Sequence, residues 1–379
     1  MTRLEWSEAV GKRVRSGDWD AQAVSTTTRV IEALRASGDV FGPGGAGLRE
    51  TAAQLVDYFM EEAKVVYLVY KVWTAGFEDW LLGQGTSPEQ LRQEFDRLAE
   101  LLAYPDGAAF EPRSHWQRLA VESGSLINGI RSYDLRVEEA ERDLERLVDA
   151  WRSLHDRYAD LMAGLLTFVA GSYGEAMLEQ CFRTVLEPYI DERYSPFDLR
   201  EHAYADTLVR NLYISIESMR GHLVGPGRRG DVELTEHDDR WVLRFDPCGS
   251  GGRQVRGDAI EGTGSRVLEP YGFGVTQKAH PWSWNEVGVC YYCAHCNFAL
   301  SLLPAERWGH PLRTVEPPLW RGTDAPETVR KCEWTVWKTL DAIPPEEYER
   351  LGRSKPSLPL YPDAGPPPRG PMPVDHGPA

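Results

Sequence analysis

The chain has 379 residues, of which 42% are hydrophobic and 13 are tryptophan, and this composition is sufficient for a folded protein with a large core. Its formal net charge of −16 argues against general nucleic-acid binding, which requires a cationic surface. The sequence has no apolar run of about 18 residues, as a transmembrane helix would need, and no basic segment followed by an apolar run at its start. We therefore expect a cytoplasmic protein that binds neither nucleic acid nor membrane.

Helical periodicity dominates the first 224 residues. The segment Ser87-Pro88-Glu89-Gln90 predicts a helix start, because Ser87 can cap, Pro88 suits the first turn and Gln90 can reach back to the cap amide. Apolar spacing, turn residues and breakers predict the following helices: 21–37, 48–82, 88–102, 114–130, 136–168, 174–189 and 197–223.

The clearest periodicity lies in the helix expected at 136–168. Its apolar residues alternate at spacings of three and four, which defines a heptad seam: Leu144, Leu147, Trp151, Leu154, Tyr158, Leu161, Leu165 and Phe168. We expect this helix to pack lengthwise in a bundle, and the seam also allows a homo-oligomer through the helical domain. The His155-Asp156 pair on this helix is expected to be a hydrogen-bonded pair, because the Glu-x-x-His pattern of di-iron bundles is absent.

The pattern changes after the breaker cluster at 225–230. Alternating apolar residues predict a β-hairpin from Val232 to Phe245, and two further strands are expected at 287–292 and 328–338. The fold class is therefore α+β, with a helical domain at 1–224 followed by a small sheet-containing domain at 231–343. Residues 353–379 are rich in proline and glycine and predict a disordered tail.

The main chemical signal is a set of four cysteines in two short segments. Cys248 lies in the first, and the second reads Cys290-Tyr291-Tyr292-Cys293-Ala294-His295-Cys296. Thiolates and imidazoles are ligands of soft and borderline metals, and a two-residue gap lets one turn present two sulfurs to one ion. We predict one metal site. Its ligands are expected to be Cys293 and Cys296, then Cys248, with the fourth position open between Cys290, His295 and His280.

Zinc is the metal expected from this spacing, and a [4Fe–4S] cluster is the alternative. The run Cys290-x2-Cys293-x2-Cys296 resembles that of ferredoxins, but the close fourth cysteine followed by proline is missing. The two other cysteines, Cys181 and Cys332, are interpreted as core residues.

A glycine-rich stretch follows Cys248. Gly249 and Gly251 let the backbone bend around a metal and donate amides to sulfur; with Arg253, they are also candidates for holding a substrate anion beside the metal.

Three functional hypotheses follow from these residues. In the first, the protein is a zinc-dependent enzyme on a small organic molecule, with His280 or Glu286 as general acid or base beside an open zinc site. In the second, a closed zinc site stabilises the fold of a non-catalytic module used for assembly or partner binding. In the third, the cysteines hold a [4Fe–4S] cluster of a redox protein.

Overall fold

The computed structural model describes residues 2–39, 42–258, 260–322 and 329–357. Its longer helices are α2 (Thr26–Ser37), α3 (Pro43–Gly83), α4 (Pro88–Leu101), α5 (Pro112–Ser132), α6 (Val137–Tyr173), α7 (Met177–Tyr194) and α8 (Tyr204–Gly221). Shorter helices are α1 (Trp19–Ala23), α9 (Gly251–Arg256), α10 (Ala294–Asn297), α11 (Leu303–Trp308) and α12 (Pro345–Glu349). The strands are β1 (Leu4–Ser7), β2 (Lys12–Arg15), β3 (Glu233–Glu236), β4 (Arg240–Phe245), β5 (Thr314–Glu316) and β6 (Cys332–Trp337).

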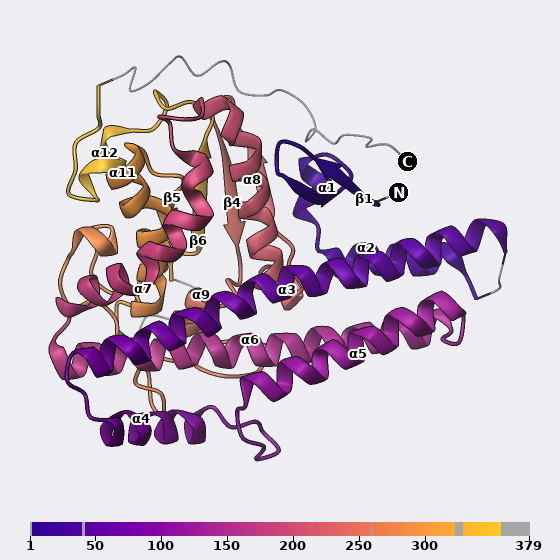
Figure 1. The fold of residues 1–379 in the computed structure, drawn as a ribbon, viewed down its shortest axis with the longest axis horizontal. Helices are drawn as coiled ribbons and strands as arrows, with labels where there is room; N and C mark the ends of the chain where they lie inside the picture. Colours follow the sequence, from indigo (N-terminus) through magenta and orange to yellow (C-terminus); the bar gives the residue numbers. More distant parts are fainter. Residues whose placement is uncertain (1, 40–41, 259, 323–328, 358–379) are drawn as a thin grey trace.

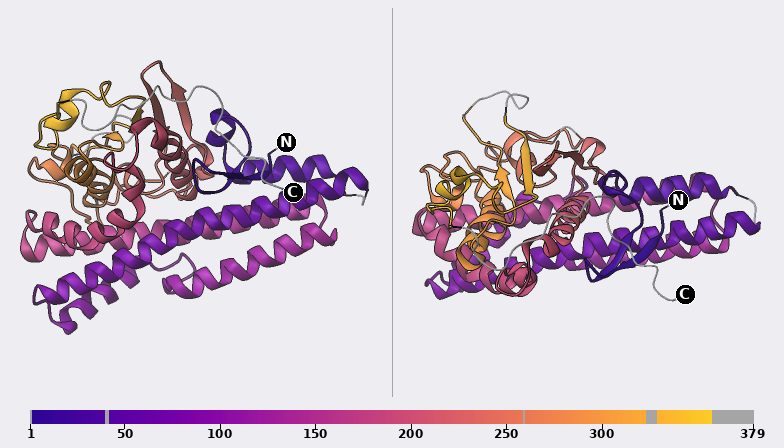
Figure 2. Two further views of the ribbon diagram at one scale, coloured as in Figure 1. Left: turned by 45° about the horizontal axis from the view of Figure 1, so that its top comes forward. Right: turned by 90° about the horizontal axis from the view of Figure 1, so that it is seen from above.

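The long helices form an elongated layer, and the rest of the chain packs on it. Helices α3 and α6 run along the length of the molecule, and α2 and α5 lie beside them at one end (Figures 1 and 2). The four-stranded sheet and the short C-terminal helices pack over the other end, together with α7 and α8. The expected α+β class is confirmed, with an antiparallel sheet in the order β3-β4-β6-β5.

Most of the expected helices are present, with shifted ends. The capping box that we expected at Ser87 and Gln90 is formed at the start of α4. The helix expected at 21–37 is divided into α1 and α2, because Ser25 turns the chain and its side chain accepts the amide of Thr28. The pairing of β1 with β2 was not predicted, since each strand has only four residues.

The sheet confirms the hairpin, which consists of β3 and β4, and the last strand, which is β6. The strand expected at 287–292 is wrong. Only isolated bridges form there, at Val289 and Cys290. From Tyr291 the chain is helical, because the Cys290 sulfur accepts the amide of Cys293 and caps a 3-10 turn at Tyr291–Cys293.

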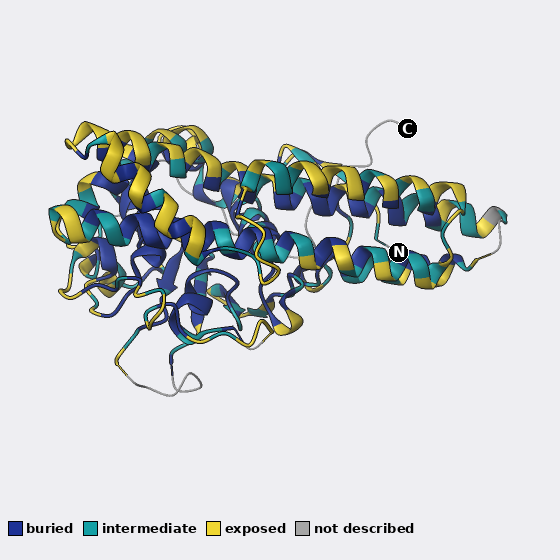
Figure 3. Ribbon diagram, turned by 90° about the horizontal axis from the view of Figure 1, so that it is seen from below, coloured by how far each residue is buried: buried dark blue, intermediate teal, exposed yellow. Residues whose placement is uncertain are grey.

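The hydrophobic core is shared by the helices and the sheet. One continuous cluster of buried side chains includes Leu154 and Leu165 on α6 together with Phe245 on β4 and Trp334 on β6. Seen from below, the buried faces of the helices point inward and the exposed faces outward (Figure 3). Seven of the eight seam residues of α6, from Leu144 to Leu165, are buried within this chain.

None of the helices in the described ranges has the length and the apolar content needed to cross a bilayer. The expected disordered tail falls almost entirely outside the described residues, which end at residue 357.

Candidate metal centre

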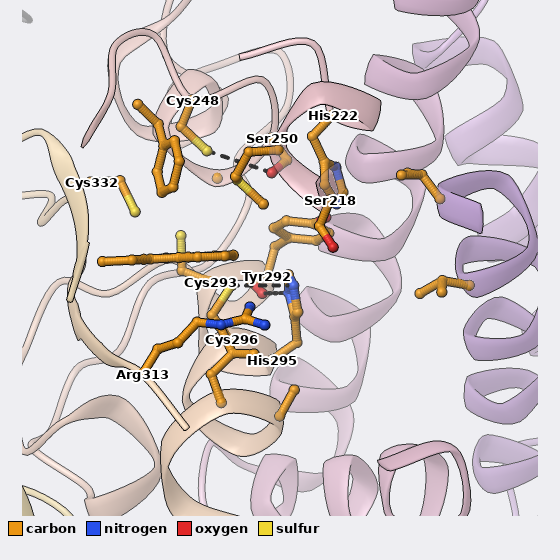
Figure 4. A pocket seen from close by; sticks show the side chains of 18 of the residues that line it. Ser218, His222, Cys248, Ser250, Tyr292, Cys293, His295, Cys296, Arg313 and Cys332 are labelled. Atoms are coloured by element: carbon orange, nitrogen blue, oxygen red, sulfur yellow. Dashed lines mark hydrogen bonds between the residues drawn. The ribbon is translucent and has the colours of Figure 1, made fainter. Parts of the chain in front are cut away.

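Four cysteines face one internal cavity of about 100 Å³ between the sheet and the helices. They are Cys248, Cys293, Cys296 and Cys332, and we call this space the cysteine cavity. In Figure 4 these side chains approach it from different elements. Its other walls are mainly apolar and come from α3, α7, α8, β4, β6 and the segment after Cys296: Val65, Val66, Val69, Trp73, Tyr189, Tyr194, Met219, Phe245, Ala299, Leu300 and Trp334.

The sheet explains why Cys248 and Cys332 meet. Phe245, the last residue of β4, pairs with Cys332, the first residue of β6. Cys248 follows three residues later, so both thiols lie at the same end of the sheet. Cys293 and Cys296 come from a run of short helical turns that starts at Tyr291 and continues through α10. Two elements of the sheet and one helical segment thus deliver the four thiols.

Glycines let the backbone approach the sulfurs closely. A Cβ atom on Gly251 would lie 2.1 Å from the sulfur of Cys293 and 3.4 Å from that of Cys290. On Gly252, a Cβ would lie 2.8 Å from the Cβ of Cys248. Only glycine fits at Gly251 without displacing the Cys293 thiol, so this residue shapes the wall of the cavity.

Cys290 lies behind the cavity wall and does not line the cavity. Its sulfur accepts the amide of Cys293 at 3.3 Å and lies 3.9 Å from the carbonyl oxygen of Gly251. Five of the six cysteines are therefore gathered in one region. Cys181 is fully buried in the core on α7, as expected.

Burial suppresses ionisation of the Cys293, Cys296 and Cys332 thiols. The hydrogen bond with Cys290, followed by burial and by the neighbouring thiols, raises the pKa of Cys293 well above its usual value. Burial raises the pKa of Cys296 and of Cys332 in the same direction, and nearby thiols add to it. Thiolates in this cavity therefore need compensating positive charge, from a metal or from cationic side chains.

The side chains of the cavity provide positive charge without a carboxylate to balance it. Arg193 and Arg313 line the cavity, and no aspartate or glutamate does so among the described residues. Arg313 is 1% exposed and extends toward Cys296 and His295 (Figure 4). Its Nε donates to Asn211 at 3.2 Å, whereas its Nη2 is buried without a hydrogen-bond partner. Burial lowers the pKa of Arg313 to about 10.

His295, a predicted ligand, lines the cavity with both ring nitrogens engaged. Its Nδ1 lies 2.5 Å from the carbonyl oxygen of Tyr292, and its Nε2 lies 3.3 Å from the sulfur of Cys296. Burial lowers the pKa of His295 to about 4, so the ring is neutral at neutral pH.

The predicted acid–base residues lie elsewhere. The Nε2 of His280 is 2.7 Å from a carboxylate oxygen of Glu175, and its ring stacks on Trp282. Glu286 is partly exposed and lies 3.7 Å from Arg330. Neither His280 nor Glu286 lines the cysteine cavity, so their assignment as acid and base stays a prediction without support from their positions.

Gly249 and Arg253, the candidates for holding an anion, do not line the cavity either. Arg253 is buried and binds Asp160 at 2.5 Å, and Gly249 packs against the backbone of His222 and the side chain of Arg228. Arg253 belongs to a buried set of ion pairs beside the cavity, which we call the arginine–aspartate layer: Arg228, Arg253, Arg266, Asp156, Asp160 and Asp258.

The spacing of the thiols bears on the choice between the two metals considered. Tetrahedral zinc with Zn–S bonds of about 2.3 Å holds its sulfurs about 4 Å apart. Among the described residues, the only three potential ligand atoms within 4.8 Å of one another belong to Asp156, Asp258 and Glu261, so no three of the sulfurs are that close. In a [4Fe–4S] cluster each thiolate binds its own iron, and the sulfurs stand further apart. The acidic triad is not a vacant cation site, because Arg228 binds Asp156 and Asp258.

Cys332 is the site residue that the sequence analysis missed. It was assigned to the core from the apolar face of its strand, and it is indeed buried. Its position on β6 beside the end of β4 also brings it into the cavity. The signal that would have found it is the pairing of β4 with β6, which sequence periodicity does not give.

Comparison of the chain with protein family models, with curated proteins and with solved structures found no match.

Proposed function

We propose that this protein is an iron–sulfur redox protein in which Cys248, Cys293, Cys296 and Cys332 ligate a [4Fe–4S] cluster. The observation that carries the proposal is the convergence of four thiols, from three separate elements, on one cavity in which no three of the sulfurs lie within 4.8 Å of one another. A void needs only about 10–15 Å³ to hold one water, so about 100 Å³ accommodates a polyatomic group.

The charge of the cavity supports the same assignment. A [4Fe–4S] centre with four thiolates is anionic, and Arg193 and Arg313 offer two cations with no carboxylate between them. The free Nη2 of Arg313 is a buried donor without an acceptor, and such a donor is costly unless it is paired. Sulfur atoms of the centre or its ligands would provide that acceptor. When bound, the cluster supplies one-electron redox chemistry.

A zinc-dependent enzyme is the second candidate. It is favoured by the close approach of two potential ligands, His295 Nε2 and Cys296 Sγ, at 3.3 Å. Two thiols would have to move toward this pair to complete a tetrahedral site. In this candidate, His295 is a ligand, whereas in the iron–sulfur protein it is not.

The experiment is a comparison of cysteine and histidine variants by metal content. We expect Cys332→Ser and Cys248→Ser to lose iron, because each removes one of four ligands. Cys181→Ser is the matched control, since Cys181 is equally buried but lies in the core of α7, and it should keep its iron. His295→Gln should also keep it.

Two results would contradict the proposal. Stoichiometric zinc without iron, lost in His295→Gln as well as in Cys296→Ser, would establish the second candidate. Retention of full iron in Cys332→Ser would exclude Cys332 as a ligand and with it the four-thiol centre. Circular dichroism of each variant would show whether loss of metal accompanies loss of the helical fold.

A further inference from the structure

A line of hydrogen bonds connects the cysteine cavity to buried Asp156. The Nδ1 of His155 lies 2.7 Å from Oδ1 of Asp156, and the Nε2 of His155 lies 2.8 Å from Nδ1 of His222. His155 and Asp156 are neighbours on α6, whereas His222 follows the end of α8 and lines the cavity. The expectation that His155 and Asp156 form a hydrogen-bonded pair is thus confirmed, and His222 extends the pair to the cavity.

The protonation of this chain of residues follows from its surroundings. Burial opposes ionisation of Asp156, but the charges of Arg228 and Arg253 hold its pKa well below the usual range. Burial lowers the pKa of His155 and, more strongly, that of His222. Both rings are therefore neutral at neutral pH while Asp156 is charged.

The charge of Asp156 and the neutrality of the two rings determine which nitrogen of each histidine carries the proton. His155 must donate its Nδ1–H to the Asp156 carboxylate, which leaves its Nε2 as an acceptor. His222 then donates from Nδ1, so its Nε2 carries a lone pair. The structure gives this Nε2 no hydrogen-bond partner among the described residues, and the ring lines the cavity. A proton-accepting atom is thus held at the edge of the cysteine cavity.

The other end of the chain reaches a second pocket. Asp156 lines a pocket of about 330 Å³ on the far side of α6, together with Asp160, Glu261 and Arg266. The Glu261 side chain on its rim is 23% exposed. Asp156 is therefore shared between this polar pocket and the histidine pair.

We propose that His222 is a proton acceptor of the cysteine cavity, oriented by His155 and Asp156, and that its Nε2 takes up one proton when one electron enters the metal centre. This inference rests on the proposed iron–sulfur centre. His222 is the proton-accepting residue, whereas His155 and Asp156 are positioning residues. The electron comes from an external reductant, dithionite in the experiment below, and the proton comes from water.

Several groups influence the proton affinity of His222. Tyr70 on α3 lies 3.3 Å from its Nδ1 and also contacts His155 and Tyr292. The charged and titratable groups that face His222 from the surrounding elements are Tyr70, His155, Asp156, Arg228, Cys248, Tyr292 and His295. Added negative charge in the cavity favours the protonated ring, as does Asp156, whereas Arg228, His155 and His295 oppose it.

The experiment is a redox titration of the purified holoprotein with dithionite over a range of pH. When one proton accompanies one electron, a tenfold change in proton activity shifts the potential by about 59 mV. We expect the wild type to show a falling potential of this slope over a window of pH, and His222→Gln to show none while its iron content stays unchanged. His310→Gln, a buried histidine away from the cavity, should retain the wild-type slope. Asp156→Asn should move the window to lower pH, because Asp156 stabilises the protonated ring.

An unchanged slope in His222→Gln would overturn the role of His222 as proton acceptor. Loss of iron in this variant would overturn it also, because His222 would then be a ligand. If the purified protein contains no reducible metal, the proposed function fails separately, and ¹⁵N-histidine NMR decides on the orientation of His222. An Nδ1–H tautomer of His222 with a bare Nε2 would support it, and an Nε2–H tautomer would exclude it.

Discussion

Two buried polar regions lie side by side in this molecule and differ in charge balance. In the arginine–aspartate layer, three guanidinium groups face three carboxylates, with contacts such as Arg228 Nη2 to Asp156 Oδ1 at 2.7 Å. In the cysteine cavity, Arg193 and Arg313 face thiols and apolar walls with no carboxylate among the described lining residues. The short helix α9 separates the two, with Gly251 on the cavity side and Arg253 in the layer.

The difference indicates which region is complete within the chain. Buried charges are tolerated when they are paired and hydrogen-bonded, and the charges of the layer are paired by its own side chains, although Nη1 of Arg253 is buried without a hydrogen-bond partner. The cationic side chains of the cavity have no carboxylate beside them. This difference supports our proposal that the cavity holds a group from outside the chain.

The largest effect is expected from breaking the balanced layer. Arg228→Met would leave Asp156 and Asp258 without their shared cation, and removal of one partner from a buried ion pair costs about 3–5 kcal/mol. Urea unfolding measures this loss. Arg244→Met is the control, because its pairs with Glu233 and Glu333 are partly exposed and their loss should change stability by less than about 1 kcal/mol. Equal effects of the two replacements would refute the structural role of the layer.

Acid provides a second test of buried charge. Burial lowers the pKa of His310 to about 4 in the folded protein, whereas an unfolded histidine titrates near 6.5. The unfolded chain therefore takes up the proton first, and stability is lost as the pH falls from about 6.5 to about 4. The difference between the two pKa values corresponds to a loss of roughly 3 kcal/mol in the free energy of unfolding. Unfolding curves of His310→Gln should lack this part of the pH dependence, and an unchanged dependence would show that His310 is not the titrating group.

A substitution on the cavity side of α9 is expected to lower metal retention. In Gly251→Ala, the new Cβ would displace the Cys293 sulfur, at a cost of about 1–3 kcal/mol for overpacking, and metal retention should fall. Gly264→Ala is the matched replacement, because its Cβ would meet no atom within 4 Å. Metal analysis and thermal unfolding of the two variants separate them, and full metal content in Gly251→Ala would place the centre elsewhere.

The smallest effect on stability is expected from Arg313. Arg313→Met removes a buried cation that has no carboxylate partner, together with its hydrogen bond to Asn211. Because these two effects on stability oppose each other, the unfolding free energy of the metal-depleted protein should change less than in Arg228→Met. Metal retention should nevertheless decrease, since a cation beside the anionic centre is lost. Strong destabilisation of the metal-depleted variant would show that Arg313 serves the fold and would remove its role as counter-charge.

The sequence was informative where physical signals are local. The capping box at Ser87, the seam from Leu144 to Leu165 and the alternation in β3 and β4 each depend on neighbouring residues, and all are present. The segment at 287–292 was misassigned because the cap formed by Cys290 outweighs the strand preference of Val289 and Tyr291.

The site could be predicted from the sequence only in part, because long-range contacts bring some of its residues to the cavity. Cys293 and Cys296 were predicted as ligands from their close spacing and Cys248 from its glycine-rich turn, and all three line the cavity. Cys332 and His222 reach the cavity through the pairing of β4 with β6 and the packing of α8 against α6, which are long-range contacts. Conversely, His280 was selected for its proximity in sequence to the tryptophans, but it binds Glu175 in the turn between α6 and α7 and does not line the cavity.

The most direct test of the four-thiol centre is the iron and acid-labile sulfide content of the wild-type protein purified without oxygen, measured with its visible spectrum. The proposed centre predicts four iron and four sulfide per chain and the broad visible absorption of thiolate-ligated iron. A colourless protein with one zinc per chain, or with no metal at all, would contradict it.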